Sequence, residues 1–289
     1  VLDGVLEAVA RAERDLDGLV IWHEAPFAVG ANLAQVAEAC KAGQFDMLEK
    51  TVAKFQRASM ALKHAMVPTV AAVQGMALGG GCEFVMHASH RVLALESYVG
   101  LVEAGVGLIP AGGGCKEFAL QAASLASRAA GGDVFPFIQN MFQTISMANV
   151  SKSALQAVEL GFAKASDDIV FNARELLHVA LHRARAIAES GYQPPLVQRA
   201  VTVAGRNGIA TCEMMLINMK EGGFISASDY RVARAAATAL CGGEVETNAK
   251  VSEQWILDVE RAQFLDLLKT EQTQQRIVHM LETGKPLRN

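Results

Sequence analysis

Residues 75–83 read Gly-Met-Ala-Leu-Gly-Gly-Gly-Cys-Glu, and they follow the apolar run Val70–Val73. We expect a strand over that run and a helix from about Gly80 to Ser89. The glycines between them would form a turn from Gly75 to Gly81, since glycine accepts backbone angles that other residues avoid. The first amides of a helix have no partner inside the helix and can bind a phosphate or a developing oxyanion. Glu83 would lie in that first turn, beside whatever the amides bind.

This pattern alone leaves two interpretations open. Neither the dinucleotide pattern G-x-G-x-x-G nor the phosphate loop G-x-x-x-x-G-K is present in these residues. A tight turn with a surface glutamate, which favours the helix start, is the commoner structure. A site for an anionic ligand is the alternative.

Two further segments share the same character. Phe27-Ala-Val-Gly-Ala-Asn-Leu33 follows the apolar run 18–22, so Gly30-Ala31 offers a second free amide. Glu103 lies 20 residues after Glu83 and precedes the glycine-rich run 107–114. Taken alone, Glu103 would be a solvated carboxylate, but beside the other two segments it becomes a second candidate acid or base.

The rest of the chain is divided by its hydrophobic periodicity. Apolar residues at three- and four-residue steps predict helices over 4–14 and 45–66, and a short apolar run predicts a strand over 91–95. Strands and helices alternate, so the front half is of the α/β class. After about residue 116 the pattern is mostly helical, and the clearest helices are expected at 173–190 and 254–283.

A break at Gly191-Tyr-Gln-Pro-Pro195 suggests two sequence domains, a core over 1–190 and a helical carboxyl-terminal region over 191–289. The chain starts with Val1 and enters helical periodicity at once. We interpret this start as a boundary within a longer protein, with the first strand of the core missing.

Composition excludes several classes of function. The chain has 26 basic and 30 acidic residues and a net charge of -4, which argues against a surface for nucleic acid or anionic membranes. It contains no apolar run of membrane-spanning length and no visible signal peptide. The five cysteines lack metal or disulfide spacing, so we expect reduced thiols in a cytoplasmic protein. His178 and His182 stand one helical turn apart without a third ligand, and we expect no metal.

Together the three glycine-containing segments resemble the crotonase, or enoyl-CoA hydratase/isomerase, superfamily. The likeness covers residues 5–115 and resumes more weakly at Ser151–Ile169 and near the carboxyl end. It implies the crotonase-like (ClpP/crotonase) spiral of ββα units with a helical C-terminal region. It also implies that the amides of Ala31 and Gly80 form an oxyanion hole.

The resemblance further implies the roles of the acidic residues. Glu83 and Glu103 would be the catalytic carboxylates, with Glu83 acting on water and Glu103 delivering a proton. The remaining substrate-binding positions implied by the family are Ala28, Gly30, Asn32 and Gly79.

Three features depart from the family. Asn32 replaces the usual aspartate, and Val102 replaces the usual proline before Glu103. Neither change removes a catalytic group if main-chain amides bind the carbonyl. The segment Lys116–Val150 is longer than the usual connection. It would be either an ordinary packing helix or a wall of the acyl-chain pocket.

The implied activity is hydration of trans-2-enoyl-CoA to 3-hydroxyacyl-CoA in fatty-acid β-oxidation. Alternatives are an isomerase that shifts the double bond from Δ3 to Δ2, and a non-catalytic acyl-CoA-binding domain. The substrate would be a coenzyme A thioester, with no covalently bound cofactor. The ending Glu282–Asn289 resembles that of bacterial 3-hydroxyacyl-CoA dehydrogenases with a final crotonase domain. We therefore expect an upstream domain that binds NAD, and either homo-oligomers or packing against that dehydrogenase.

Overall fold

The computed structural model describes residues 1–289, which form two compact units. The first unit contains Val1–Ala31, Lys54–Leu101 and Val150–Val197, and the second contains Asn32–Ala53, Val102–Asn149 and Gln198–Asn289. Each unit is assembled from segments that are far apart in the sequence. The division into sequence domains 1–190 and 191–289 stays a prediction.

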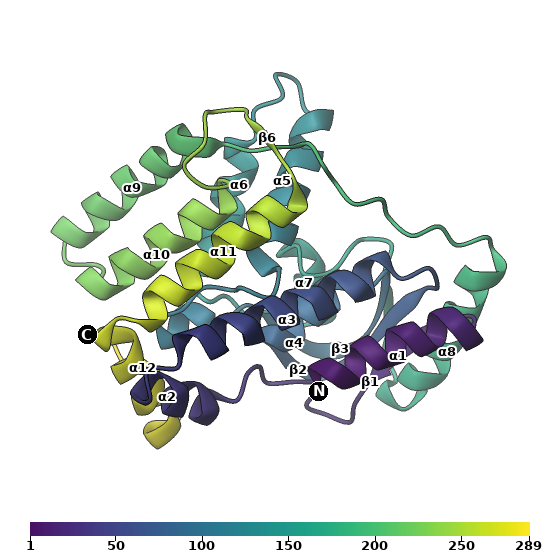
Figure 1. Cartoon of the computed structure of the whole chain (residues 1–289). Helices are drawn as coiled ribbons and strands as arrows, with labels where there is room; N and C mark the ends of the chain where they lie inside the picture. Colours follow the sequence, from purple (N-terminus) through teal and green to yellow (C-terminus); the bar gives the residue numbers. More distant parts are fainter. The chain divides into compact units, whose positions relative to one another are not determined.

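The first unit is built on a parallel four-stranded sheet with the order β1-β2-β3-β4 (Figure 1). Val70 is paired with His90, and Val92 is paired with Asp168. The strands expected over 18–22, 70–73 and 91–95 are confirmed. The strands are β1 Leu19–Trp22, β2 Thr69–Leu78, β3 His90–Gly100 and β4 Asp168–Val170.

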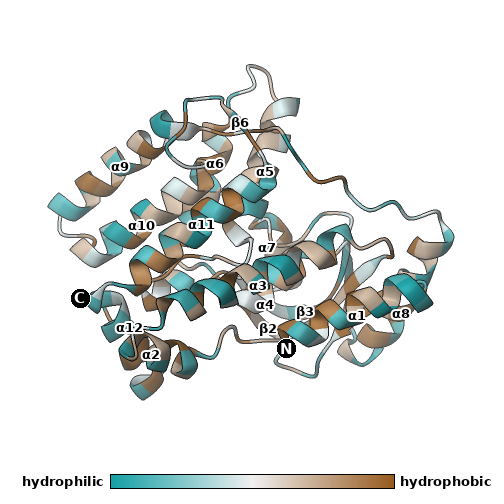
Figure 2. Ribbon diagram, viewed as in Figure 1, coloured by the Kyte–Doolittle hydropathy of each residue, from teal (hydrophilic) through white to brown (hydrophobic).

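Helices cover both faces of this sheet because successive strand residues point to opposite sides. Val20 packs with the apolar side of α8 (Leu176–Glu189), whereas Leu19 and Ile21 pack with α1 (Leu2–Asp15) and the end of α3 (Phe45–His64). Figure 2 shows apolar and polar residues alternating along α1, as one buried face requires. The helices expected at 4–14, 45–66 and 173–190 are therefore confirmed. The remaining helices of this unit are α4 Gly80–His87, α7 Ala154–Glu159 and the 3₁₀ turn η2 Ala173–Glu175.

Strand β2 corrects the expected turn from Gly75 to Gly81. The strand continues past Gly75 to Leu78, with a register shift between Val73 and Gly75. Gly75 has φ +63°, and a Cβ there would lie 3.1 Å from the Cβ of Ala25. Gly75 is thus required by a β-bulge rather than by a turn. The change from strand to helix takes place at Gly79.

The second unit is mainly helical. Its central helix, α10, packs against α5, α6, α9 and α11 (Figure 1). Most of α10 is buried and much of it is alanine, so neighbouring helices approach closely. The elements of this unit are α2 Leu33–Lys41, η1 Glu103–Val106, α5 Gly114–Arg128, α6 Phe135–Ser146, β5 Val201–Thr202, α9 Gly205–Glu221, α10 Ala227–Leu240, β6 Lys250–Val251, α11 Glu253–Leu268 and α12 Glu271–Thr283.

Helices α2, α11 and α12 differ from the sequence prediction. The single helix expected at 254–283 is two, because α11 ends at Leu268 and Thr270 caps the start of α12, where its side chain accepts a hydrogen bond from the Thr273 N–H at 3.3 Å. Helix α2 was not predicted. None of the helices is both long and apolar enough to span a bilayer.

Candidate active site

The site begins where β2 changes into α4. Gly79 lies in a conformation with φ +54°, which permits the abrupt change of direction. Its N–H donates to the carbonyl of Gly100 at 2.9 Å, so the turn is fixed to the end of β3. The Glu83 N–H then donates to the Gly79 carbonyl at 3.0 Å, which forms the first turn of α4.

The segment around Ala28 runs alongside this turn, within the same unit. The Ala28 N–H donates to the Met76 carbonyl at 3.0 Å, and the Leu78 N–H donates to the Ala28 carbonyl at 2.9 Å. A Cβ on Gly81 would lie 2.5 Å from the Cβ of Ala28, closer than real side chains come. The two backbones therefore meet with no room for a side chain on Gly81.

Two main-chain amides lie at this junction. Gly30 has φ +94°, and a Cβ built on it would lie 4.0 Å from the Gly80 nitrogen. The Gly80 N–H begins α4, and the Ala31 N–H follows Gly30 directly. Neither N–H donates to another main-chain group of the chain. The structure thus brings Ala28, Gly30, Gly79 and Gly80 together, with Ala31 next in sequence.

Glu83 is buried, with only 2% of its surface exposed. It lies in the first turn of α4, where the positive end of the helix dipole favours a carboxylate. Its main-chain carbonyl lies 2.6 Å from Nδ1 of His87, which is also buried. Glu83 is therefore not the solvated glutamate that the glycine pattern alone would allow.

Glu103 belongs to the second unit, in the 3₁₀ turn η1. Its Oε2 atom is buried and has no hydrogen-bond partner. Burial raises the pKa of Glu103 to about 7, although hydrogen bonds from its own main chain and from Val102 act in the opposite direction. A carboxyl group of this kind holds a proton near neutral pH, as a general acid requires.

The loop that carries Glu103 is held by α12, and sequence reasoning missed the residues that hold it. Gly107 has φ +79°, and its carbonyl accepts a hydrogen bond from Thr273 Oγ1 at 2.9 Å. A Cβ on Gly107 would lie 2.9 Å from Cδ of the buried Arg276. Arg276 is itself fixed by Asp229, at 2.9 Å. No local sequence signal links these residues to Glu103, because they lie more than a hundred positions away.

Asn32, in the second unit, uses its side chain to cap α2. Its Oδ1 accepts hydrogen bonds from the N–H groups of Ala34 and Gln35 at 3.1 and 3.3 Å. Aspartate and asparagine serve equally as caps, so this change from the family residue keeps the cap. The signal that could have predicted α2 is a capping residue, Asn32, directly before the residues that form the helix.

The remaining residues and segments that the sequence singled out are the histidine pair, the long segment after Lys116 and the cysteines. His178 and His182 are exposed on α8, with ring centroids 4.3 Å apart. The segment Lys116–Val150 forms α5 and α6, which pack against each other and against α10. All five cysteines are buried, and none forms a disulfide.

The sequence and the fold resemble those of known proteins. Residues 2–129 match the family model described as enoyl-CoA hydratase/isomerase. An enoyl-CoA hydratase from Bacillus halodurans shares the fold, with a TM-score of 0.61 at 14% identity over 96% of this chain and 88% of that one. The expected crotonase-like fold is confirmed. Residues 2–129 therefore belong to the enoyl-CoA hydratase/isomerase, or crotonase, family.

Two relatives match nearly the whole chain. The chain is 37% identical to the probable 3-hydroxyacyl-CoA dehydrogenase of Bacillus subtilis, over all of this chain and 36% of that protein. It is 30% identical to the fatty acid oxidation complex subunit alpha of Idiomarina loihiensis, over 96% of this chain and 35% of that protein. The chain thus spans about a third of the length of these relatives.

Proposed function

We propose that the chain is an enoyl-CoA hydratase, which adds water to trans-2-enoyl-CoA and forms 3-hydroxyacyl-CoA. The observation that carries this proposal is the pair of main-chain amides at Ala31 and Gly80, beside the buried Glu83 at the start of the same helix. Family membership supports it, because the matching model covers all of these residues.

The amides would bind the thioester carbonyl oxygen of the substrate. Negative charge grows on that oxygen as water adds to the β-carbon, and fixed N–H donors stabilise it. One such donor is typically worth about 10²–10³ in rate. Ala28, Gly30 and Gly79 would form the surrounding backbone, and Asn32 would contribute through the start of α2.

The two carboxylates would divide the proton transfers. Glu83 orients and deprotonates the attacking water, and Glu103 delivers a proton to the α-carbon. The raised pKa of Glu103 supports this division, because a carboxyl group protonated near neutral pH can donate. General acid–base help of this kind contributes about 10²–10⁴ for each group.

Hydration of crotonyl-CoA by the purified chain tests the proposal. Loss of the enoyl absorbance with formation of 3-hydroxybutyryl-CoA is the expected result. Conversion of a 3-enoyl-CoA without hydration would indicate the isomerase instead. Binding of the thioester with no turnover of either substrate would indicate an acyl-CoA-binding domain.

We infer that the natural protein also contains a 3-hydroxyacyl-CoA dehydrogenase, which would bind NAD outside this chain. The support is that relatives named for dehydrogenation and fatty-acid oxidation are about three times as long as the matched region. We further propose a cytoplasmic location, because five cysteines without a disulfide fit a reducing compartment. The chain would either form homo-oligomers or pack against its dehydrogenase.

A further inference from the structure

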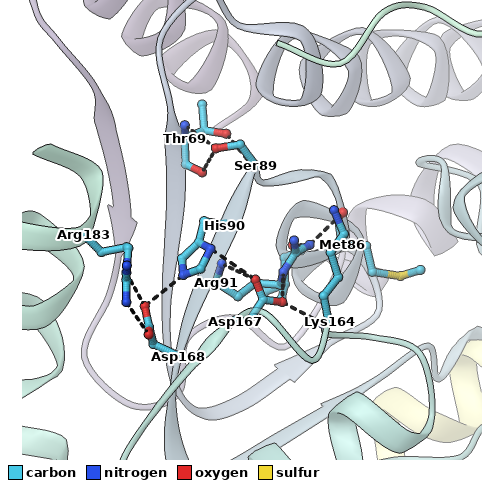
Figure 3. A network of polar contacts seen from close by, with 10 residues as sticks. Thr69, Met86, Ser89, His90, Arg91, Lys164, Asp167, Asp168 and Arg183 are labelled. Carbon is cyan, nitrogen blue, oxygen red and sulfur yellow. Dashed lines mark hydrogen bonds and ion pairs between the residues drawn. The ribbon is translucent and has the colours of Figure 1, made fainter. Parts of the chain in front are cut away.

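A buried arginine lies against the end of the helix that carries Glu83 (Figure 3). Arg91, at the start of β3, is only 1% exposed. Its Nη1 donates to the main-chain carbonyls of Val85 and Met86, each at 3.2 Å. These carbonyls are in the last turn of α4, where they have no partner inside the helix.

Asp167 fixes the guanidinium in this position. Its Oδ2 accepts from Arg91 Nε at 2.5 Å, and its Oδ1 accepts from the Arg91 main-chain N–H at 3.1 Å. Asp167 is itself held, since the Lys164 N–H donates to Oδ2 at 2.6 Å. Both side chains are almost completely buried, which makes the geometry specific.

An outer layer of the same network makes no hydrogen bond or ion pair to α4. The His90 ring lies between Asp167 and Asp168, and Asp168 pairs with Arg183 on α8 (Figure 3). Arg183 is 43% exposed. It therefore offers a matched control, an arginine in one network with Arg91 that pairs with Asp168 and makes no bond to α4.

Helix α4 is thus held at both ends. Gly79 and Ala28 fix its start, while Arg91 fixes its end and places a positive charge where the helix dipole favours one. The helix has only eight residues, and Val85, whose carbonyl binds Arg91, lies two positions after Glu83. A shift of its last turn would therefore move the carboxylate.

We propose that Arg91, through Asp167, is a positioning residue that holds Glu83 in its catalytic place. This proposal rests on the hydratase function proposed above. Arg91 does not touch the substrate, and its effect passes through the orientation of α4.

Arg91→Lys is the test, because lysine keeps the charge but cannot bond to two carbonyls and a carboxylate in the same geometry. With crotonyl-CoA, kcat should fall about 10-fold or more while KM changes less than about 3-fold. Arg183→Lys should change kcat less than about 2-fold. In a Glu83→Gln background, the loss caused by Arg91→Lys should shrink to less than about 3-fold, since the group that it positions is gone.

Hydrogen exchange at the amides of residues 84–88 supplies an independent readout. It should become faster in Arg91→Lys and stay unchanged in Arg183→Lys. An Arg91→Lys enzyme with wild-type kcat, or with the same loss in both backgrounds, would overturn the proposal. If that variant does not fold, Asp167→Asn is carried through the same cycle, and wild-type kcat there has the same meaning. A wild-type chain without hydratase activity would refute the function alone, and the exchange data would still decide whether Arg91 fixes α4.

Discussion

At the scale of single residues, Glu83 and Glu103 carry one functional group in two environments. Glu83 lies in the first turn of a helix, and Glu103 lies in a 3₁₀ turn with one oxygen buried and unpaired. Burial favours the protonated form of a carboxyl group, and the pKa of Glu103 is raised to about 7 accordingly.

Glu83→Gln and Glu103→Gln should each lower the kcat for hydration by at least about 10²-fold, because each replaces a proton carrier by an amide of similar shape that cannot carry the proton. Thermal unfolding should show little change in midpoint, which separates the loss from misfolding. Near wild-type turnover in either variant would show that the residue has another role.

The pH dependence should report the raised pKa of Glu103. Because the folded pKa is about 7 and the ordinary value is 4.5, the folded state holds a proton between these values that the unfolded state has released. This contribution to stability therefore falls as pH rises from about 4.5 to 7 and is constant above. For the same reason, kcat/KM should decline as pH rises through about 7.

Matched measurements identify the group. Urea unfolding from pH 4.5 to 8 and the pH profile of kcat/KM should both lose this feature in Glu103→Gln. The same decline of kcat/KM in the variant would assign the titration to another residue.

The sequence predicts some of these residues and not others. Glu83 could be found because glycines and a helix start surround it locally. Arg91 could not, because its partner Asp167 lies 76 positions away and nothing near Arg91 distinguishes it from a solvent-facing strand residue. The buried state of Glu103 also depends on packing that no local pattern records.

At the scale of elements, the glycines of α4 have distinct requirements. A Cβ built on Gly81 would lie 2.5 Å from the Cβ of Ala28. A Cβ built on Gly80 would lie 3.0 Å from Cζ at the end of the Phe55 ring. The first neighbour is next to a main chain, and the second is the far end of a side chain. Substitutions at the two positions should therefore fail in different ways.

Gly81→Ala should destabilise the fold by about 1–3 kcal/mol, because an added methyl group has no space. Chemical denaturation measures this loss. Ala28→Gly should recover part of it in the double variant, since the closest contact is removed while the Ala28 carbonyl remains at 3.1 Å. Strictly additive effects of the two changes would show that this contact does not limit the packing.

Gly80→Val should abolish hydration, because the branched side chain would press on Phe55 and displace the amide that binds the carbonyl. The kcat for crotonyl-CoA measures it, and circular dichroism checks that the variant folds. A folded and fully active Gly80→Val enzyme would remove this turn from the mechanism.

Elements were predicted where periodicity was long or flanked by clear breaks. Helix α3 and strands β1 to β3 follow from local pattern. Gly75 misled the prediction because a bulge and a turn both use glycine, and only the neighbouring Ala25 decides between them. The break at Thr270 was missed because a single cap residue is a weak signal within a continuous apolar pattern.

At the scale of the whole molecule, each compact unit joins segments from distant parts of the chain. Helix α2 packs with α12 in the second unit, although some 230 positions separate them. Local periodicity contains no record of such pairings, so the units could not be predicted. Family resemblance supplied the fold that local reasoning could not.

The intact natural protein should couple hydration to oxidation. With crotonyl-CoA and NAD⁺, it should produce NADH, whereas this chain alone should stop at the 3-hydroxyacyl product. Absorbance at the NADH band measures the difference. An intact reading frame that encodes no dehydrogenase would leave a stand-alone hydratase and disprove the fusion.

The bond between Thr273 and Gly107 has a consequence for biosynthesis. A ribosome releases Glu103 and its loop long before it makes α12, 166 positions later than Gly107. Until then, Gly107 lacks the hydroxyl and the arginine stem that pack on it. A nascent or prematurely terminated chain could complete the helix of Glu83 but not the support of Glu103. If the chain is the proposed hydratase, turnover should therefore appear only after synthesis of α12.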